Sequence, residues 1–111
     1  MEEISFADFE KVCLVCGTII EAKEFPEAKK PAYLLKVDLG ERFGIKNSSA
    51  QITQLYRRED LVGRQVLCVV NFPPKKIASF WSEVLVCGFA SGEGVVLASP
   101  DRKVPNGTRL S

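Results

Sequence analysis

The segment from residue 71 to residue 82 places two adjacent cations among aromatic side chains, directly after two prolines that stiffen the backbone. Its cations are Lys75 and Lys76, and its rings are Phe72, Phe80 and Trp81. Cations neutralise phosphates, and exposed rings stack on bases at about 1–3 kcal/mol per base, so the segment has the chemistry that single-stranded nucleic acid requires. Two alternatives stay open: the rings could hold apolar peptide side chains, or the phenylalanines could pack in the core.

Side chains suited to catalysis are poorly represented. The chain has no histidine, the commonest general acid or base at neutral pH, and no nucleophile stands out beside a base. The glycine-bearing run 88–94 joins two strand-like segments and begins no helix, so it lacks the context of a phosphate-binding loop. Nothing singles out the carboxylates Asp38 and Glu83 as a site. We therefore expect a binding protein without a cofactor, not an enzyme.

Four cysteines, Cys13, Cys16, Cys68 and Cys87, lie in apolar surroundings. The spacer between Cys13 and Cys16 is β-prone, and residues three apart on a strand point to opposite faces. A zinc site would need all four thiols, because there is no histidine, and a redox pair would need a helix N-terminus that the sequence does not encode. We expect core thiols and no metal, with structural zinc and a redox pair as the alternatives.

The composition of the 111 residues predicts a single domain, 1–111, in the cytoplasm, with no membrane insertion. No leader-like segment or long apolar run is present. The net charge of +1 hides an uneven distribution, since residues 42–76 hold seven basic and two acidic side chains. Hydrophobic residues make up 46%, which is high for so small a chain and indicates apolar surface covered by a partner.

The periodicity predicts an all-β fold. A short N-terminal helix is expected at 5–10, where Ser5 and Asp8 approximate a capping box, and it should lie as a lid over the sheet. A loose helical pattern follows at 50–62. Strands are expected at 12–24, 33–39, 44–48, 64–71, 83–88 and 95–98, with a hairpin-like connection at 40–44 and a turn at 91–94. This order is that of an OB-fold, a five-stranded Greek-key barrel, here with one short inserted helix.

An OB-fold binds ligands on the face of its second and third strands and on the flanking loops. This would bring Lys36, Arg42 and Lys46 toward the basic segment at 75–76. Asn47, Ser48 and Ser49 add short hydrogen-bonding groups suited to phosphates or 2′-hydroxyls. The alternative for these residues is a turn with a solvated edge.

Two runs carry a resemblance to a known family. One reads Asn-Phe-Pro-Pro-Lys-Lys from residue 71 and continues as Phe-Trp-Ser-Glu-Val-Leu-Val from residue 80. The other reads Gly-Ile-Lys-Asn-Ser-Ser-Ala-Gln-Ile-Thr from residue 44, and shorter matches lie at 25–28 and 104–107. Together they resemble the tRNA-binding domain family, and most closely its small secretion chaperones, over nearly the whole chain.

The resemblance implies an OB-fold homodimer that binds tRNA or another structured RNA, and that also acts as an export chaperone for unfolded preproteins. The alternative is mainly a chaperone with little RNA binding. The implied RNA-associated residues are Lys46, Ser48, Ser49, Lys75, Lys76, Ser82 and Glu83, to which the predicted barrel face adds Lys36 and Arg42. A peptide groove would be lined by Phe25, Phe72, Phe80 and Trp81. The candidates for the dimer interface are Phe6, Phe9, Val104 and Leu110.

One departure from the family pattern lies in the first predicted strand. Where the family usually has Asp-x-Arg-x-Gly, this chain has Cys13 for the aspartate and Val15 for the arginine. If that arginine contacts phosphate in relatives, this protein lacks the contact. If instead the two charges pair structurally, losing both together avoids an unpaired buried charge.

Overall fold

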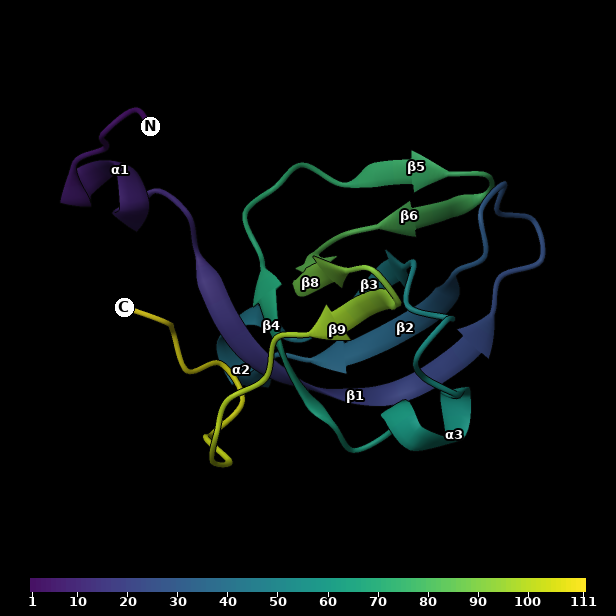
Figure 1. Cartoon of the computed structure of the whole chain (residues 1–111). Coiled ribbons are helices and arrows are strands. Elements are labelled where there is room, and N and C mark those ends of the chain that lie inside the picture. Colours follow the sequence, from purple (N-terminus) through teal and green to yellow (C-terminus); the bar gives the residue numbers. More distant parts are fainter.

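A curled antiparallel sheet forms the body of the molecule in a computed structural model that describes all residues, 1–111 (Figure 1). Its strand order is β3-β2-β1-β4-β7. The five strands are β1 (Leu14–Glu24), β2 (Tyr33–Asp38), β3 (Ile45–Ala50), β4 (Gln65–Val69) and β7 (Leu85–Val86). Two hairpins complete the nearly closed barrel: β5 (Lys75–Ile77) with β6 (Phe80–Ser82), and β8 (Gly88–Ser91) with β9 (Gly94–Leu97). The predicted all-β OB-fold barrel is confirmed.

Strand alternation separates the core from the surface. In β2, Tyr33, Leu35 and Val37 are buried, whereas Lys36 between them is exposed. The buried side chains of all five barrel strands meet in one cluster, which also includes Leu61 from α3 (Arg58–Leu61). The barrel strands therefore share one hydrophobic core.

Strand β1 pairs with β4 through its first half and with β2 through its second half. A bulge between Ile19 and Glu21 bends the strand where the change occurs. Gly17 lies in the tightest part, since a Cβ atom there would come within 2.6 Å of Leu39 and 2.7 Å of Val37. The absence of a side chain at Gly17 therefore allows β1 to coil closely against β2.

The N-terminal helix α1 (Phe6–Glu10) has the predicted capping box: the Asp8 amide donates to Ser5 Oγ at 3.1 Å, and the Ser5 amide donates to Asp8 Oδ2 at 3.2 Å. The backbone amide of Ser5 lowers the pKa of the Asp8 carboxyl most, and the Ser5 hydroxyl lowers it further. The expected lid is wrong, because α1 buries no residue and projects from one side of the barrel (Figure 1). Its apolar side chains have no barrel surface to cover.

Other boundaries also differ from the prediction. Residues 40–44 do connect β2 and β3 as an antiparallel hairpin, with Asp38 opposite Ile45, but the connection contains a short helix, α2 (Gly40–Phe43). The pattern at 50–62 becomes helical only at α3, and the strand expected at 83–88 is reduced to β7 followed by β8. The turn at 91–94 is confirmed. None of the helices has the length and apolar character needed to cross a bilayer.

The four cysteines are free thiols, with Cys16 and Cys68 buried and the other two half-buried. Cys68 lies in the core, where burial raises the pKa of its thiol to about 12. Burial raises the pKa of Cys16 and Cys87 as well. Thiols held in the protonated form are poor nucleophiles and poor metal ligands, so their surroundings match the interpretation as core side chains.

The C-terminal segment runs beside the start of β1. The Cys16 amide donates to the Thr108 carbonyl at 2.9 Å, and the Leu110 amide donates to the Leu14 carbonyl at 2.8 Å. Both chain ends consequently lie on the same side of the molecule, away from the turn of the β5–β6 hairpin (Figure 1).

Candidate nucleic-acid interface

The predicted proline-stiffened basic loop is a β-hairpin. Strands β5 and β6 pair in the register Lys75 with Ser82 and Lys76 with Trp81. Successive residues of a strand point to opposite faces, so Lys75 and Lys76 lie on opposite faces of the hairpin. The connection turns through Ala78, whose φ of 54° is rarely adopted by residues other than glycine.

The inner face of this hairpin docks on the loop between β1 and β2. The rings of Phe25 and Phe80 are tilted against each other with centroids 5.6 Å apart, and Ser79 Oγ donates to Glu27 Oε2 at 3.3 Å. Phe25 is buried. The prediction that Phe25 and Phe80 line an open peptide groove is therefore wrong for Phe25, whose ring is covered by protein, and Phe80 serves as its packing partner.

The outer face carries Lys76 and Trp81. The Lys76 Nζ atom lies 6.0 Å from the centroid of the Trp81 ring, and Trp81 is 53% exposed. The pair presents a cation and an aromatic face to solvent together, at the limit of a cation–π contact. Trp81 thus shares no groove with the other predicted peptide-binding rings.

The two runs that carry the family resemblance meet at one seam, which closes the barrel between β3 and residues 82–84. Ser48 Oγ donates to the Val84 carbonyl at 2.8 Å, and the Ser49 amide donates to Ser82 Oγ at 3.1 Å. Glu83 accepts at Oε1 from the Asn47 amide at 3.0 Å and donates its own amide to the Asn47 carbonyl at 2.8 Å. At this seam, hydrogen bonds between side chains and backbone groups replace part of the backbone-to-backbone pairing expected between two strands.

The seam corrects part of the predicted RNA face. Ser48 is 1% exposed and its hydroxyl is already bonded, so it cannot reach a ligand without opening the barrel. Glu83 Oε2 also lies 3.9 Å from Lys46 Nζ. This carboxylate therefore partly neutralises the charge of that lysine. The side chains of Ser48, Ser82 and Glu83 make hydrogen bonds that close the barrel, whereas the side chain of Ser49 stays on the surface.

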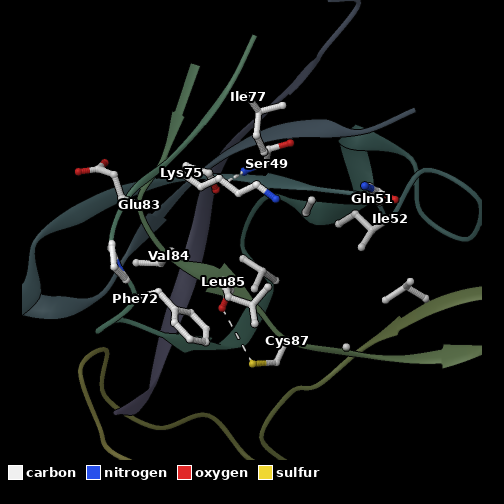
Figure 2. Close-up of a pocket in the computed structure, with 16 residues that line it drawn as sticks. Ser49, Gln51, Ile52, Phe72, Lys75, Ile77, Glu83, Val84, Leu85 and Cys87 are labelled. Carbon is white, nitrogen blue, oxygen red and sulfur yellow. Dashed lines mark hydrogen bonds between the residues drawn. The ribbon is translucent and has the colours of Figure 1, made fainter. Parts of the chain in front are cut away.

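A groove of about 700 Å³ opens beside the seam. Its floor is apolar and buried, formed by Ile52, Val84 and Val86. Phe72 lies beside Leu85 on one side, and Lys75 extends past Ser49 toward Gln51 on the other (Figure 2). Phe72 and Leu85 are 55% and 50% exposed, so this apolar wall is open to solvent.

The candidate cations differ in whether a carboxylate neutralises them. Lys46 faces Glu83, whereas Lys36, Arg42, Lys75 and Lys76 have no carboxylate within ion-pair distance. Lys36 lies across from Asn47 in the β2–β3 pairing, on the predicted face. Arg42 is on α2, which lies at the opposite end of the barrel from the hairpin turn (Figure 1), and it stacks over Phe43 at 5.1 Å. The structure thus separates Arg42 from the other candidates.

Sequence reasoning missed four surface residues here. Lys29 and Lys30 are exposed on the loop that holds the hairpin, and neither has a carboxylate partner. Leu85 and Gln51 line the groove. The alternation of buried Val84 and Val86 around Leu85 could have shown that Leu85 points outward. No sequence signal brings Lys29 and Lys30 to the hairpin, because the Phe25–Phe80 contact is tertiary.

The dimer candidates lie at the end where the termini meet. Phe6 is 68% exposed, and its ring lies against that of Phe9, with ring centroids 6.1 Å apart. Leu110 is exposed, whereas Val104 is half-buried. The backbone carbonyl of Val104 accepts from Gln65 Nε2, and its backbone amide donates to Gln65 Oε1. Asn71 fixes the direction of α1: its side chain accepts from the Cys13 amide at 2.9 Å and donates to the Lys11 carbonyl at 2.7 Å.

The departure in the first strand lies away from the groove. Val15 is fully buried in the core and Cys13 is half-buried against it. A side chain at position 15 has no route to a ligand on the surface. This supports the interpretation that a charged pair at these positions would be structural.

A curled OB-fold barrel with an open groove and unpaired cations defines a class of binding modules for nucleic acids and other chain-like ligands. Residues 14–109 match the family described as "Putative tRNA binding domain". The chain belongs to the tRNA-binding domain family.

Two solved chaperones have nearly the same structure as this chain. It is similar to the CsaA chaperone protein from Picrophilus torridus, with 47% identity, a TM-score of 0.94 and coverage of 98% of this chain and 100% of that one. It is similar also to the chaperone CsaA of Bacillus anthracis str. Ames, with 49% identity, a TM-score of 0.92 and coverage of 99% and 100%. The suspected kinship with the small chaperones is confirmed.

The chain also matches part of a larger enzyme. It is 36% identical over 110 residues to the methionine–tRNA ligase of Pyrococcus horikoshii. The matched region covers 99% of this chain but only 15% of that protein. The match lies in one domain of a ligase, so the similarity says nothing of ligase chemistry here.

Proposed function

We propose that this protein binds tRNA or a similarly structured RNA through the β5–β6 hairpin and the neighbouring β2–β3 face, as a cytoplasmic homodimer and without catalysis. The single observation that supports this best is the hairpin itself. It displays Lys75 and Lys76 without carboxylate partners, together with an exposed Trp81 ring. Unneutralised cations attract phosphates, and the ring offers a stacking surface.

The distribution of charge supports the same surface. Lys29, Lys30 and Lys36 join the hairpin lysines without opposing acids, whereas Arg57 and Arg58 each pair with a carboxylate. The net charge of +1 therefore underestimates the positive charge at this end of the barrel.

A titration of labelled bulk tRNA at low and at physiological salt tests the proposal. Wild-type affinity should fall steeply with salt, because neutralised phosphates release counterions. The Lys75→Ala/Lys76→Ala variant should bind more weakly, with a slope of log K against log salt shallower by about 1.4–1.8, or 0.7–0.9 per lost phosphate contact.

A matched control removes two adjacent exposed cations elsewhere. Arg102→Ala/Lys103→Ala changes the net charge equally, on a loop outside the hairpin. If both double variants lose the same affinity, the binding is only a response to net charge. If the wild-type protein binds no tRNA at low salt, the proposed function fails.

A second candidate function, chaperone activity on unfolded preproteins, is favoured by the apolar wall of the groove. Phe72 and Leu85 are about half exposed over a buried apolar floor, an arrangement that could hold an apolar side chain. Protection of an aggregating substrate should then survive high salt and be lost in Phe72→Ala. An absence of protection at stoichiometric protein would exclude this activity.

A further inference from the structure

We propose that the groove beside the hairpin holds one unpaired nucleotide of the bound RNA, with its base stacked on Phe72 and its phosphate at Lys75. This inference rests on the proposed function and narrows it. The RNA would need a single-stranded segment, because bases inside a continuous helix have no free face to stack on a side chain.

The aromatic wall provides the first argument. The Phe72 ring is 55% exposed beside Leu85, over a floor whose side chains are almost fully buried. A flat base inserted here would cover the exposed apolar surface of both Phe72 and Leu85. The groove volume of about 700 Å³ is within the range of about 300–1,000 Å³ that is usual for small-ligand sites.

The polar rim provides the second argument. Lys75 has no carboxylate partner, and Gln51 makes no side-chain hydrogen bond, although its amide can both donate and accept. Glu83 is the one acid among the lining residues, and it points away from the groove in Figure 2, toward its partners Lys46 and Asn47. The rim of the groove therefore carries one unpaired cation, Lys75, and in Gln51 an amide that is free to hydrogen-bond a base edge.

Charge decides between the two possible occupants. An apolar peptide side chain would use the apolar wall but would make no ionic interaction with the unpaired cation beside it. A nucleotide uses both, because its base is an aromatic face and its phosphate is an anion. The same combination recurs on the outer face of the hairpin, where Lys76 lies over Trp81.

The test uses an RNA stem-loop with a short single-stranded tail that contains a fluorescent purine analogue, and a second probe in which abasic sugars replace the tail bases. Both probes carry the same number of phosphates. Wild-type protein should prefer the intact tail by about tenfold, with quenching of the analogue on binding. Phe72→Leu should abolish the preference while retaining an apolar side chain, and Lys75→Ala should weaken binding of both probes.

Phe89→Leu is the control, because Phe89 is 67% exposed but lies outside the groove. It should keep the full preference for bases. If wild-type protein binds intact and abasic tails equally while tRNA binding still depends on Lys75 and Lys76, the inference is overturned and the proposed function stands. If neither tRNA nor either probe binds, both fail. If a permanently unfolded polypeptide binds with the Phe72 dependence that the bases lack, the groove belongs to the chaperone activity instead.

Discussion

At the scale of single residues, neighbours in the sequence have different tasks because a strand sends them to opposite faces. Ser48 closes the barrel from inside, whereas Ser49 lines the groove. Lys75 points into the groove and Lys76 lies against Trp81 on the other face. A motif of adjacent polar residues therefore mixes structural and surface positions.

Ser48→Ala should lower the free energy of unfolding by about 1–3 kcal/mol, because it leaves the Val84 carbonyl without its buried donor. Ser49→Ala is the matched control, since the Ser49 hydroxyl makes no hydrogen bond, and should change stability by less than about 0.5 kcal/mol. Urea unfolding measures both. Equal losses in the two variants would contradict the assignment of Ser48 to the seam.

The free energy of unfolding should decrease as the pH rises above 9. Burial raises the pKa of Cys68 from 9.0 to about 12, so the unfolded chain releases this proton before the folded protein does. Its contribution is complete below pH 9 and is lost progressively toward pH 12; Cys16 and Cys87 act in the same direction. Urea unfolding at neutral pH and at about pH 10 should show a smaller decrease in Cys68→Ala. An identical decrease would contradict this.

At the scale of elements, the β5–β6 hairpin depends on an unusual turn. Ala78 has a φ of 54°, which costs a residue with a Cβ atom roughly 1 kcal/mol, and a β-branched side chain more. The turn sets the register that places Lys75 opposite Ser82 and Lys76 opposite Trp81. The geometry of the site therefore depends on this one position.

Ala78→Val should loosen the hairpin and weaken tRNA binding, although every cation is retained. Ala78→Gly is the control, because glycine adopts positive φ freely and should leave the affinity unchanged. The titration used for the lysine variants measures both. Unchanged affinity in Ala78→Val would mean that RNA binding needs the charges but not the hairpin geometry.

Local signals explain which elements the sequence could predict. The capping box of α1 and the turn at 91–94 were predictable because their partners lie within three residues of each other. Strand β2 was predictable from its alternation. The strand expected at 83–88 is present only as the shorter β7, because Glu83 bonds Asn47 instead, a partner 36 residues away that no local pattern reveals.

At the scale of the whole molecule, no apolar side chain of α1 is buried within a single chain. Asn71 holds the helix away from the barrel, and Phe6 remains exposed beside Phe9. The hydrophobic content of 46% indicated a partner, and some of the exposed apolar residues, such as Ile4, Phe6 and Leu110, belong to the two terminal segments. A second copy of the chain is the proposed cover.

Phe6→Glu should convert the proposed dimer to a monomer at micromolar concentration, since a carboxylate would be buried without a partner in an apolar interface. Sedimentation velocity measures the change. Phe89→Glu, at a similarly exposed ring outside α1, should remain dimeric. A wild-type protein that sediments as a monomer would refute the homodimer itself.

The candidate site was only partly predictable from the sequence. The cations and rings of the hairpin could be recognised from their residue types. Which ring lies across from which lysine could not be predicted, because that depends on the hairpin register. Ser48 matched a motif of surface residues, yet the seam buries it. Lys29 and Lys30 reach the site only through the Phe25–Phe80 contact.

Both chain ends lie on the side of the molecule opposite the hairpin turn, and this affects how the protein can be attached to a support (Figure 1). A tag or surface anchor at either end would leave the hairpin turn and the lysines of the hairpin facing solution. The same anchor would crowd α1 and the C-terminal segment. An immobilised protein should therefore keep its affinity for RNA while losing its capacity to self-associate, so sensor-based and free-solution assays should differ in stoichiometry before they differ in affinity.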